Sequence, residues 1–400
     1  MDKYIGIDVH AASCTIAVVD ARGKQTGSHV VATNGQEIVE CLRAIPGQRH
    51  VCFEEGTQSG WLYEILEPHA VEVVVAGVGA GSRGPKDDKR DAFGLAEDLR
   101  QGAIKTRVFK NGGPYKALRE LARTHRMVVR DVVRTKNRIK SMYRSRGVAV
   151  AGKSVYSSAG REPWQEQLPE ACRGPVRTLY AELDALEEVR NDAEKALVQE
   201  ARKFPITKLL STCPGLGPIR AAQLVPIVVS PHRFRTKRQF WSYCGLGIVM
   251  RSSSDWVRDK NGQWQRAQVQ QTRGLNLTHN HHLKAIFKGA ATTVIAQHPD
   301  EPLNLSYQRW LAAGTKPNLA KVSLARKIAT IVLVMWKTEE EYDSSKHSKT
   351  VSPEVVLDGV SSLVMGSQAL PRRDTARRQR FEGEYPLFRW TRESSRSSQA

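Results

Sequence analysis

Acidic residues stand at three places in the first hundred residues where their neighbours predict an ordered position. Asp8 lies inside the apolar run Tyr4–Val9, which predicts a short buried β-strand. A carboxylate in such a run is costly to desolvate unless a cation or a hydrogen-bond donor compensates its charge. Asp8 is therefore the first candidate for chemistry; for this residue taken alone, an aspartate that binds a loop amide is the alternative.

Two further groups of acids follow along the chain. Glu54 and Glu55 come at the end of the predicted strand His50–Phe53, and ligands bind at the carboxyl ends of strands in open α/β sheets. Asp88 and Asp91 lie three residues apart at the start of a predicted helix, so both carboxylates share one face. Such a pair is either solvated, since helix N-termini favour acids, or held by a divalent cation.

Together the acids offer four hard oxygen donors from three segments, namely Asp8, Glu55, Asp88 and Asp91. Magnesium prefers such ligands. Two metal ions about 4 Å apart can stabilise both the attacking and the leaving oxygen of a phosphodiester. The acids therefore predict a Mg²⁺ (or Mn²⁺) site that acts on a nucleic-acid strand.

The elements that would hold these acids alternate between strands and helices, as in an α/β fold. Apolar patterns predict further strands at 14–20, 25–33 and 71–76, helices at 34–45 and after Trp61, and a Gly-rich loop at 77–84. Such a sheet brings the ends of distant strands together, which is what a shared metal site requires.

The overall charge favours a polyanionic partner. The chain has 400 residues, a formal net charge of +20 and a pI near 9.8, and neutralising phosphates with Lys and Arg releases counterions. A basic membrane-surface protein is the alternative. No run of about 18 apolar residues and no signal peptide is apparent, so we expect a cytoplasmic, nucleoid-associated protein without a membrane partner.

Cysteine and histidine usage gives little support to a second metal site. No Cys-x-x-Cys pair occurs, and most cysteines stand in apolar contexts, so we expect reduced core residues at Cys14, Cys41, Cys52, Cys172, Cys213 and Cys244. The histidines His279, His281 and His282 cluster, but no cysteine or acid lies beside them at ligand spacing.

Two long helices are predicted in the middle of the chain, one from Pro114 to about Met142 and one at Val176–Ala201. The first carries a basic flank that predicts nucleic-acid binding by Arg123, Arg126, Arg130, Arg134, Arg138 and Lys140. The second helix is acidic and approximates an a/d seam, so it is the alternative partner for this flank, within an antiparallel helical hairpin. The polar segment 147–174 between them is predicted to be a loop.

The ordered acid motifs resemble the DEDD transposases of bacterial insertion sequences. They are Ile-Gly-Ile-Asp8-Val, Glu55-Gly-Thr and Lys86-x-Asp88-x-x-Asp91-Ala. The resemblance is to insertion-sequence family one-ten, the bridge-RNA-guided recombinases, to which the Piv-type DNA invertases are related. It implies a RuvC-like RNase H fold in which Asp8, Glu55, Asp88 and Asp91 bind the catalytic metals. Glu54 and Asp87 stay open as substitutes.

The resemblance continues in the second half of the chain. Residues 209–222 predict two helices joined by a Gly-containing turn, which either binds a phosphate at the second helix's N-terminus or is only a tight turn. Residues 234–246 follow the family's pattern, and the family's nucleophilic serine then falls on Ser253. Its neighbours Ser252 and Ser254 stay open. The resemblance implies that this serine attacks the phosphate and becomes covalently attached to DNA.

The predicted organisation has four parts: a RuvC-like catalytic domain at 1–112, a helical hairpin or coiled-coil arm at 113–203, a mostly α-helical transposase domain at 204–343, and a mobile basic tail at 344–400. The resemblance implies donor and target DNA and a structured bridge RNA as partners, and a homodimer that becomes a homotetramer on DNA. The alternatives are a metal-dependent RNase H-like junction nuclease that uses water, and a non-catalytic nucleic-acid-binding protein.

Overall fold

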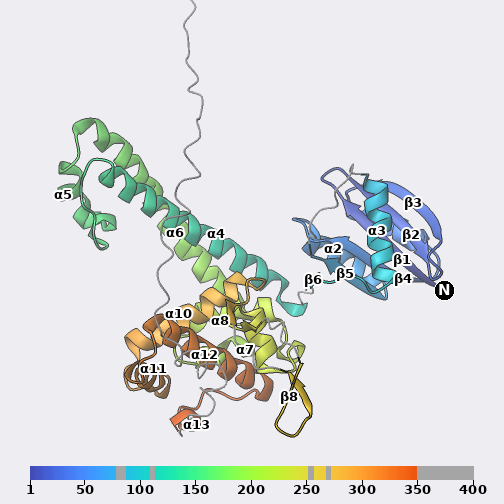
Figure 1. The fold of residues 1–400 in the computed structure, drawn as a ribbon. Helices are drawn as coiled ribbons and strands as arrows, with labels where there is room; N and C mark the ends of the chain where they lie inside the picture. The colour runs from blue at the N-terminus through green and yellow to red at the C-terminus, as the bar shows by residue number, and fades with distance from the viewer. Residues whose placement is uncertain (78–86, 109–112, 251–255, 267–271, 349–400) are drawn as a thin grey trace, which may run out of the picture. The chain divides into compact units, whose positions relative to one another are not determined.

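The computed structural model describes residues 1–77, 87–108, 113–250, 256–266 and 272–348. By the contacts between them, the described residues divide into two units: 256–266 and residue 348 belong to the second unit, and the other described residues belong to the first. Figure 1 traces the helices and strands in chain order.

A six-stranded mixed sheet opens the chain, in the order β3-β2-β1-β4-β5-β6. Its strands are β1 (Asp2–Val9), β2 (Ser13–Asp20), β3 (Gln25–Ala32), β4 (Gln48–Glu54), β5 (Glu72–Ala76) and β6 (Arg107–Val108). The first three strands pair antiparallel, β4 and β5 run parallel to β1, and β6 is antiparallel to β5. The five strands predicted from the sequence are all present, each within two residues of its expected bounds, and β6 is an additional strand.

Helices cover both faces of this sheet. On one face, Ile5 and Ile7 of β1 and Phe53 of β4 pack against α1 (Gly35–Ala44) and α2 (Ser59–Leu66). Asn34 caps α1 as expected, because its side chain accepts a hydrogen bond from the Glu37 N–H. A short 3₁₀ turn, η1 (Glu67–His69), follows α2.

The helix α3 (Asp88–Arg100) lies along the other face of the sheet (Figure 1). It approaches β1 so closely that a methyl group added to Gly6 would lie 1.9 Å from the carbonyl oxygen of Ala92 and 2.7 Å from the Ala96 nitrogen. Only glycine fits between the strand and the helix at this position. Strand β1 and helix α3 are therefore held in direct backbone contact.

A helical hairpin, which we call the arm, follows the 3₁₀ turn η2 (Gly113–Tyr115). Its two long helices are α4 (Lys116–Arg144) and α6 (Glu170–Ala201). They run antiparallel, because Thr135 contacts Glu182 whereas Tyr143, further along α4, contacts Tyr180, earlier in α6 (Figure 1). The end of the arm has its own apolar core, which includes Val132, Ile139, Tyr143, Val155, Leu168, Cys172, Val176 and Leu183.

The arm corrects two sequence predictions. The second helix begins at Glu170 rather than Val176, with Pro175 inside it, because Leu168 and Cys172 are buried in the core of the arm. Residues 147–174 are not simply a loop: they contain the 3₁₀ turns η3 (Ser154–Tyr156) and η4 (Ser158–Gly160), the helix α5 (Arg161–Glu166) and the start of α6.

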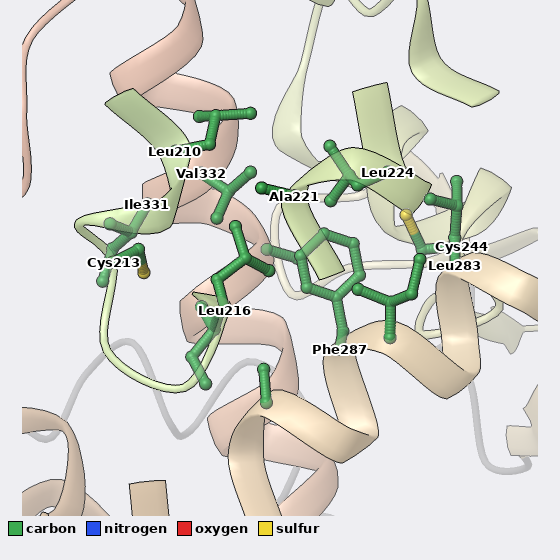
Figure 2. Packing of buried hydrophobic residues seen from close by; sticks show 14 of the residues in the cluster. Leu210, Cys213, Leu216, Ala221, Leu224, Cys244, Leu283, Phe287, Ile331 and Val332 are labelled. Atoms are coloured by element: carbon green, nitrogen blue, oxygen red, sulfur yellow. The ribbon is translucent and has the colours of Figure 1, made fainter. Parts of the chain in front are cut away.

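A helical domain follows the arm. Its helices are α7 (Pro205–Ser211), α8 (Gly217–Val228), α9 (Lys237–Tyr243), α10 (His281–Gln297), α11 (Pro302–Ala312) and α12 (Pro317–Thr338), with the 3₁₀ turn η5 (Pro231–Arg233) before α9. Figure 2 shows Leu210 of α7, Leu224 of α8, Phe287 of α10 and Val332 of α12 meeting in one core. Leu118 and Ala122, near the start of α4, belong to the same core.

Short strands interrupt this domain, where the sequence predicts none. Strand β7 (Ile248–Met250) pairs with β10 (Thr272–Leu275), and β8 (Trp256–Arg258) forms a hairpin with β9 (Trp264–Arg266) in the second unit. The Asp259 carboxylate accepts hydrogen bonds from the Asn261 and Gln263 N–H groups and so closes the hairpin turn. A last helical turn, α13, spans Ser345–Ser348.

All six cysteines are free, and five of them are buried, as expected for reduced core residues. Among the described residues, no helix combines the length and the apolar character that crossing a membrane requires.

Candidate active site

Asp8 and Asp88 meet at the end of β1, although 80 positions separate them. The His10 Nε2 atom lies 3.2 Å from the Asp8 Oδ2 and 3.2 Å from the Asp88 Oδ1. Asp8 stands two residues after Gly6, on the face of β1 that α3 covers, and Asp88 is the first residue of α3. The close packing of strand and helix thus brings the two carboxylates together.

The electrostatics of this group favour a bound cation. Burial raises the pKa of Asp8, His10 opposes this, and the nearby charges of Asp88 and Asp91 raise it further. The pKa of His10 is raised, first by its hydrogen bond to Asp88 and then by the charge of Asp8. The carboxylates of Asp88 and Asp91 thus act unfavourably on the charge of Asp8, and a cation between Asp8 and Asp88 would relieve this repulsion.

The donor set suits a divalent ion. One ligand atom from each of Asp8, His10 and Asp88 lies within 4.8 Å of the others. The Asp8 side chain is 24% exposed and that of Asp88 is 53% exposed, so the carboxylates are open to solvent on one side. A shallow depression beside them is lined by Thr15, Ser28, Val30, Asp87, Asp88 and Lys89. A substrate phosphate can reach such a site from solvent.

Glu54 is the last residue of β4, which pairs with β1, and Glu55 follows it. Phe53 pairs in register with Ile7, so Glu54 stands level with Asp8. The side chain of Cys52 packs on the α3 face whereas Phe53 packs on the opposite face, so the alternation along β4 directs Glu54 toward the face of Asp8. The Glu55 N–H donates to the Ala76 carbonyl at 2.8 Å. Within the part of the chain that the structure describes, neither glutamate joins the group of close ligand atoms around His10.

Asp87 has a structural role at this site. It is the N-cap of α3, and its carboxylate accepts a hydrogen bond from the Lys89 N–H at 3.1 Å. Asp88 and Asp91 then occupy the first turn of the helix, as the sequence predicts. The cap orients this first turn, which carries both acids.

His10 is the residue of the site that the sequence analysis missed. It stands two positions after Asp8, in the short connection between β1 and β2. Its proximity to Asp8 in the sequence was a usable signal, whereas its contact with Asp88 depends on how α3 crosses the sheet.

Comparison with known families decides the identity. A DEDD transposase model of the IS110 type matches residues 5–145, and the model of the transposase IS116/IS110/IS902 family matches residues 207–308. Together the two ranges cover more than half of the chain. The protein belongs to the IS110 family of transposases. No curated protein matches the chain.

Membership of the IS110 family establishes the coarse activity. An IS110 transposase is a DNA transposase or recombinase, and its partner is DNA. A DEDD transposase domain also implies dependence on a divalent metal ion. The site on β1 and α3 lies in the range that the DEDD model matches.

The candidate nucleophile of this IS110 transposase, Ser253, lies outside the described residues, as do its neighbours Ser252 and Ser254. The preceding Gly245 adopts a φ of +67°, and a side chain there would collide with the His279 ring. The structure therefore describes the chain as far as residue 250, just before these serines.

The basic flank of α4 divides into two halves in the transposase. Its C-terminal half has partners within the arm: Arg134 pairs with Asp131 at 3.0 Å, Arg138 pairs with Glu182 at 3.2 Å, and the Lys140 ammonium lies 5.4 Å from the centre of the Tyr156 ring. Its N-terminal half differs, because Arg123, Arg126 and Arg130 form no ion pair with any described residue. The in-chain counter-charge that the acidic second helix suggests therefore applies to Arg138, which pairs with Glu182 of α6, whereas the partner of Arg134 lies on α4 itself.

Proposed function

We propose that this IS110 transposase cuts and rejoins DNA by combining the acid cluster, with Mg²⁺ or Mn²⁺, and a serine nucleophile. The observation that carries the proposal is the meeting of Asp8 and Asp88 around one His10 nitrogen, with the charge of Asp91 close by. Four acids from three segments would hold the metal: Asp8, Asp88, Asp91 and a glutamate at the end of β4.

The strand order supports a RuvC-like RNase H fold for residues 1–112. Three antiparallel strands followed by two strands parallel to the first, with the first acid on the central β1, match the fold that the resemblance implies. The helical hairpin or coiled-coil arm at 113–203, the helical domain at 204–343 and the tail at 344–400 complete the proposed organisation.

In the proposed mechanism, four carboxylates would hold the metal ion and fix its position: those of Asp8, Asp88, Asp91 and either Glu54 or Glu55. When bound, such an ion polarises the phosphate and stabilises the charge that develops on its oxygens. Ser253 Oγ forms a bond to the phosphorus, and the bond to one deoxyribose oxygen breaks. The serine loses a proton and the departing oxygen gains one, so the step needs no further reactant, and rejoining is its reverse.

The remaining elements of the proposal rest on the resemblance. A structured bridge RNA would select donor and target DNA by base pairing, and a homodimer would assemble into a homotetramer on DNA. The expected place of action is the cytoplasm, at the nucleoid. RNA that co-purifies with the protein and pairs with two separate DNA sites would support this part.

The alternative is a junction nuclease that uses the same acids and water as its nucleophile. The acid cluster alone would suffice for it, since water replaces Ser253.

A trapping experiment separates the two mechanisms. Protein, cognate DNA and Mg²⁺ are resolved on denaturing gels, and the proposal predicts a covalent protein–DNA adduct that Ser253→Ala abolishes and Ser252→Ala retains. Asp8→Asn and Asp88→Asn should lower the yield of cleaved strand by at least a hundredfold, since each removes a metal ligand. Cleavage without any adduct would favour the nuclease, and full cleavage by Asp8→Asn would disprove the role of the acid cluster.

A further inference from the structure

Two exposed tryptophans lie on the hairpin that β8 and β9 form (Figure 1). Trp256 is 56% exposed and Trp264 is 60% exposed. Tryptophan is seldom left so open to solvent in a folded domain, because its ring system is large and mostly apolar. None of the apolar cores among the described residues includes a residue of this hairpin. Two such rings on one short element indicate a surface that a partner covers.

The register of the hairpin places both rings on the same face. Arg258 stands directly opposite Trp264, and Trp256 lies two residues before Arg258 on the same strand. Residues that stand opposite each other share a face of a β-hairpin, and so do residues two apart along a strand. The turn fixes this register, because the Gly262 N–H donates to the Asp259 carbonyl at 3.0 Å and Gly262 adopts a φ of +75°. Trp256, Arg258 and Trp264 therefore form one common face.

Positive charge accompanies the rings on this face. The Arg258 guanidinium lies over the Trp264 ring, 4.9 Å from its centre. A guanidinium in this position keeps its N–H groups available for phosphate oxygens. The exposed Lys260 follows in the turn, and residues 256–266 contain three basic residues and one acid, Asp259. The Asp259 carboxylate accepts two hydrogen bonds within the turn. The hairpin thus combines flat apolar rings with a net positive charge.

The partner that fits this chemistry is a nucleic acid with exposed bases. Aromatic rings stack on bases of any sequence, because every base has a flat π-face, and neighbouring cations bind the backbone. An apolar protein surface would suit the rings but would remove Arg258 from water without giving it an anion. DNA is the partner that membership of the IS110 family establishes, and the net charge of +20 complements it.

The bases that reach these rings must be unpaired. Inside a duplex the neighbouring base pairs cover each base on both sides, so a tryptophan contacts the π-face only when the base leaves the stack. Strand transfer supplies such bases, because a strand that moves to a new partner leaves its former complement unpaired.

We infer that the hairpin of β8 and β9 is a stacking platform for unpaired DNA bases. Trp256 and Trp264 contact the bases, and Arg258 contacts the backbone beside them. This inference uses only the DNA partner of the family, and it is independent of Ser253, of the acid cluster and of the bridge RNA.

Equilibrium binding by the full chain without Mg²⁺ tests the platform, and the measurement does not depend on strand cleavage. The probes are a fluorescein-labelled single-stranded DNA, its duplex, and a single-stranded RNA of the same sequence. Trp256→Leu and Trp264→Leu should each weaken binding of the single-stranded DNA about tenfold, because each removes a stacking ring. Binding of the duplex should change less than about twofold, since it depends mainly on phosphate contacts.

The salt dependence separates stacking from charge. Trp256→Leu and Trp264→Leu remove no charge, so their salt slopes on single-stranded DNA should equal that of wild type. Arg258→Gln should reduce the slope by about 0.7, the change expected for one phosphate contact on a single strand.

Two controls separate stacking from folding. Trp264→Phe keeps an aromatic ring and should retain most of the affinity that Trp264→Leu loses. Trp61→Leu removes an exposed tryptophan of α2, outside the hairpin, and should leave the affinity for every probe within about twofold of wild type. The melting temperatures of the hairpin variants should match that of wild type, because the hairpin belongs to none of the described cores.

The platform is disproved if Trp256→Leu and Trp264→Leu both bind single-stranded DNA like wild type, or if Trp61→Leu or Trp264→Phe loses as much affinity as they do. A loss confined to the RNA probe would overturn the assignment to DNA. A changed oligomeric state with unchanged DNA affinity would also overturn it, because a second copy of the chain would then cover this face.

Discussion

The adjacent residues Glu54, which ends β4, and Glu55, which follows it, are not equivalent. Glu54 shares the α3 face with Asp8, whereas Glu55 follows one residue later. The resemblance favours Glu55, while the alternation along the strand favours Glu54.

We predict that Glu54→Gln lowers Mg²⁺-dependent strand cleavage at least a hundredfold, because it removes a metal ligand. Glu55→Gln should then retain activity within about tenfold. The measurement is the single-turnover cleavage rate at saturating Mg²⁺ for both variants, with folding checked by melting temperature. The reverse order of the two rates would assign the ligand to Glu55.

At the residue scale, the sequence identifies acids better than it identifies their neighbours. Asp8 is recognisable because a carboxylate inside an apolar strand needs compensation, and Asp88 and Asp91 because their spacing puts them on one helix face. In the sequence, Asp87 is a further candidate metal ligand beside Asp88 and Asp91. Its N-capping role is recognisable only once the start of the helix is known. The contact of His10 with Asp88 depends on tertiary packing, which no local pattern encodes.

At the scale of the elements, the arm is held by a contact that joins α5 to α6. The Arg161 guanidinium donates two hydrogen bonds of 2.6 Å to the Asp184 carboxylate and lies 4.4 Å from the centre of the Tyr180 ring. Its side chain is only 12% exposed. The hydrogen bonds from Arg161 lower the pKa of Asp184 below its ordinary value of 3.8.

Asp184→Asn should therefore lower the free energy of unfolding by about 0.5–1 kcal/mol near neutral pH, a value discounted for the exposure of the carboxylate. Because the pKa of Asp184 is lower in the folded state, its stabilisation is complete above 3.8 and is lost as the pH falls through the folded value. Urea unfolding at neutral pH and at about pH 3 checks this, since the difference between variant and wild type should shrink in acid.

The matched control for this contact is Asp192→Asn. Asp192 pairs with Lys195 on the same helix, but both side chains are well exposed, so we expect no measurable change. An equal loss in the two variants would mean that the Arg161 contact contributes nothing of its own.

The elements themselves were predictable where their patterns were long. The 29-residue α4 and the five strands β1 to β5 follow from apolar periodicity. The start of α6 could not be predicted in this way, because Gly174 and Pro175 are helix breakers in isolation. In the folded protein the burial of Cys172 overrides that local preference. The strands β7 to β10 have three or four residues each, too few for alternation to be visible.

At the scale of the whole molecule, the charge of +20 determines how binding responds to salt. We predict that the affinity for duplex DNA falls linearly on logarithmic axes as the salt concentration rises, with a slope of about −0.9 for each phosphate neutralised. Fluorescence anisotropy over a range of NaCl concentrations measures this slope. A flat dependence would contradict phosphate contacts by the N-terminal half of the α4 flank.

Gly6, where β1 contacts α3, affects how the transposase would bind a metal ion. Because strand and helix touch backbone to backbone at Gly6, the separation of the first acid from the pair on α3 is set by main-chain geometry rather than by adjustable side chains. If these acids hold the metal ion as we propose, their backbone positions are preorganised, so metal uptake would require only side-chain adjustment and the cost of bringing the segments together is met when the domain folds.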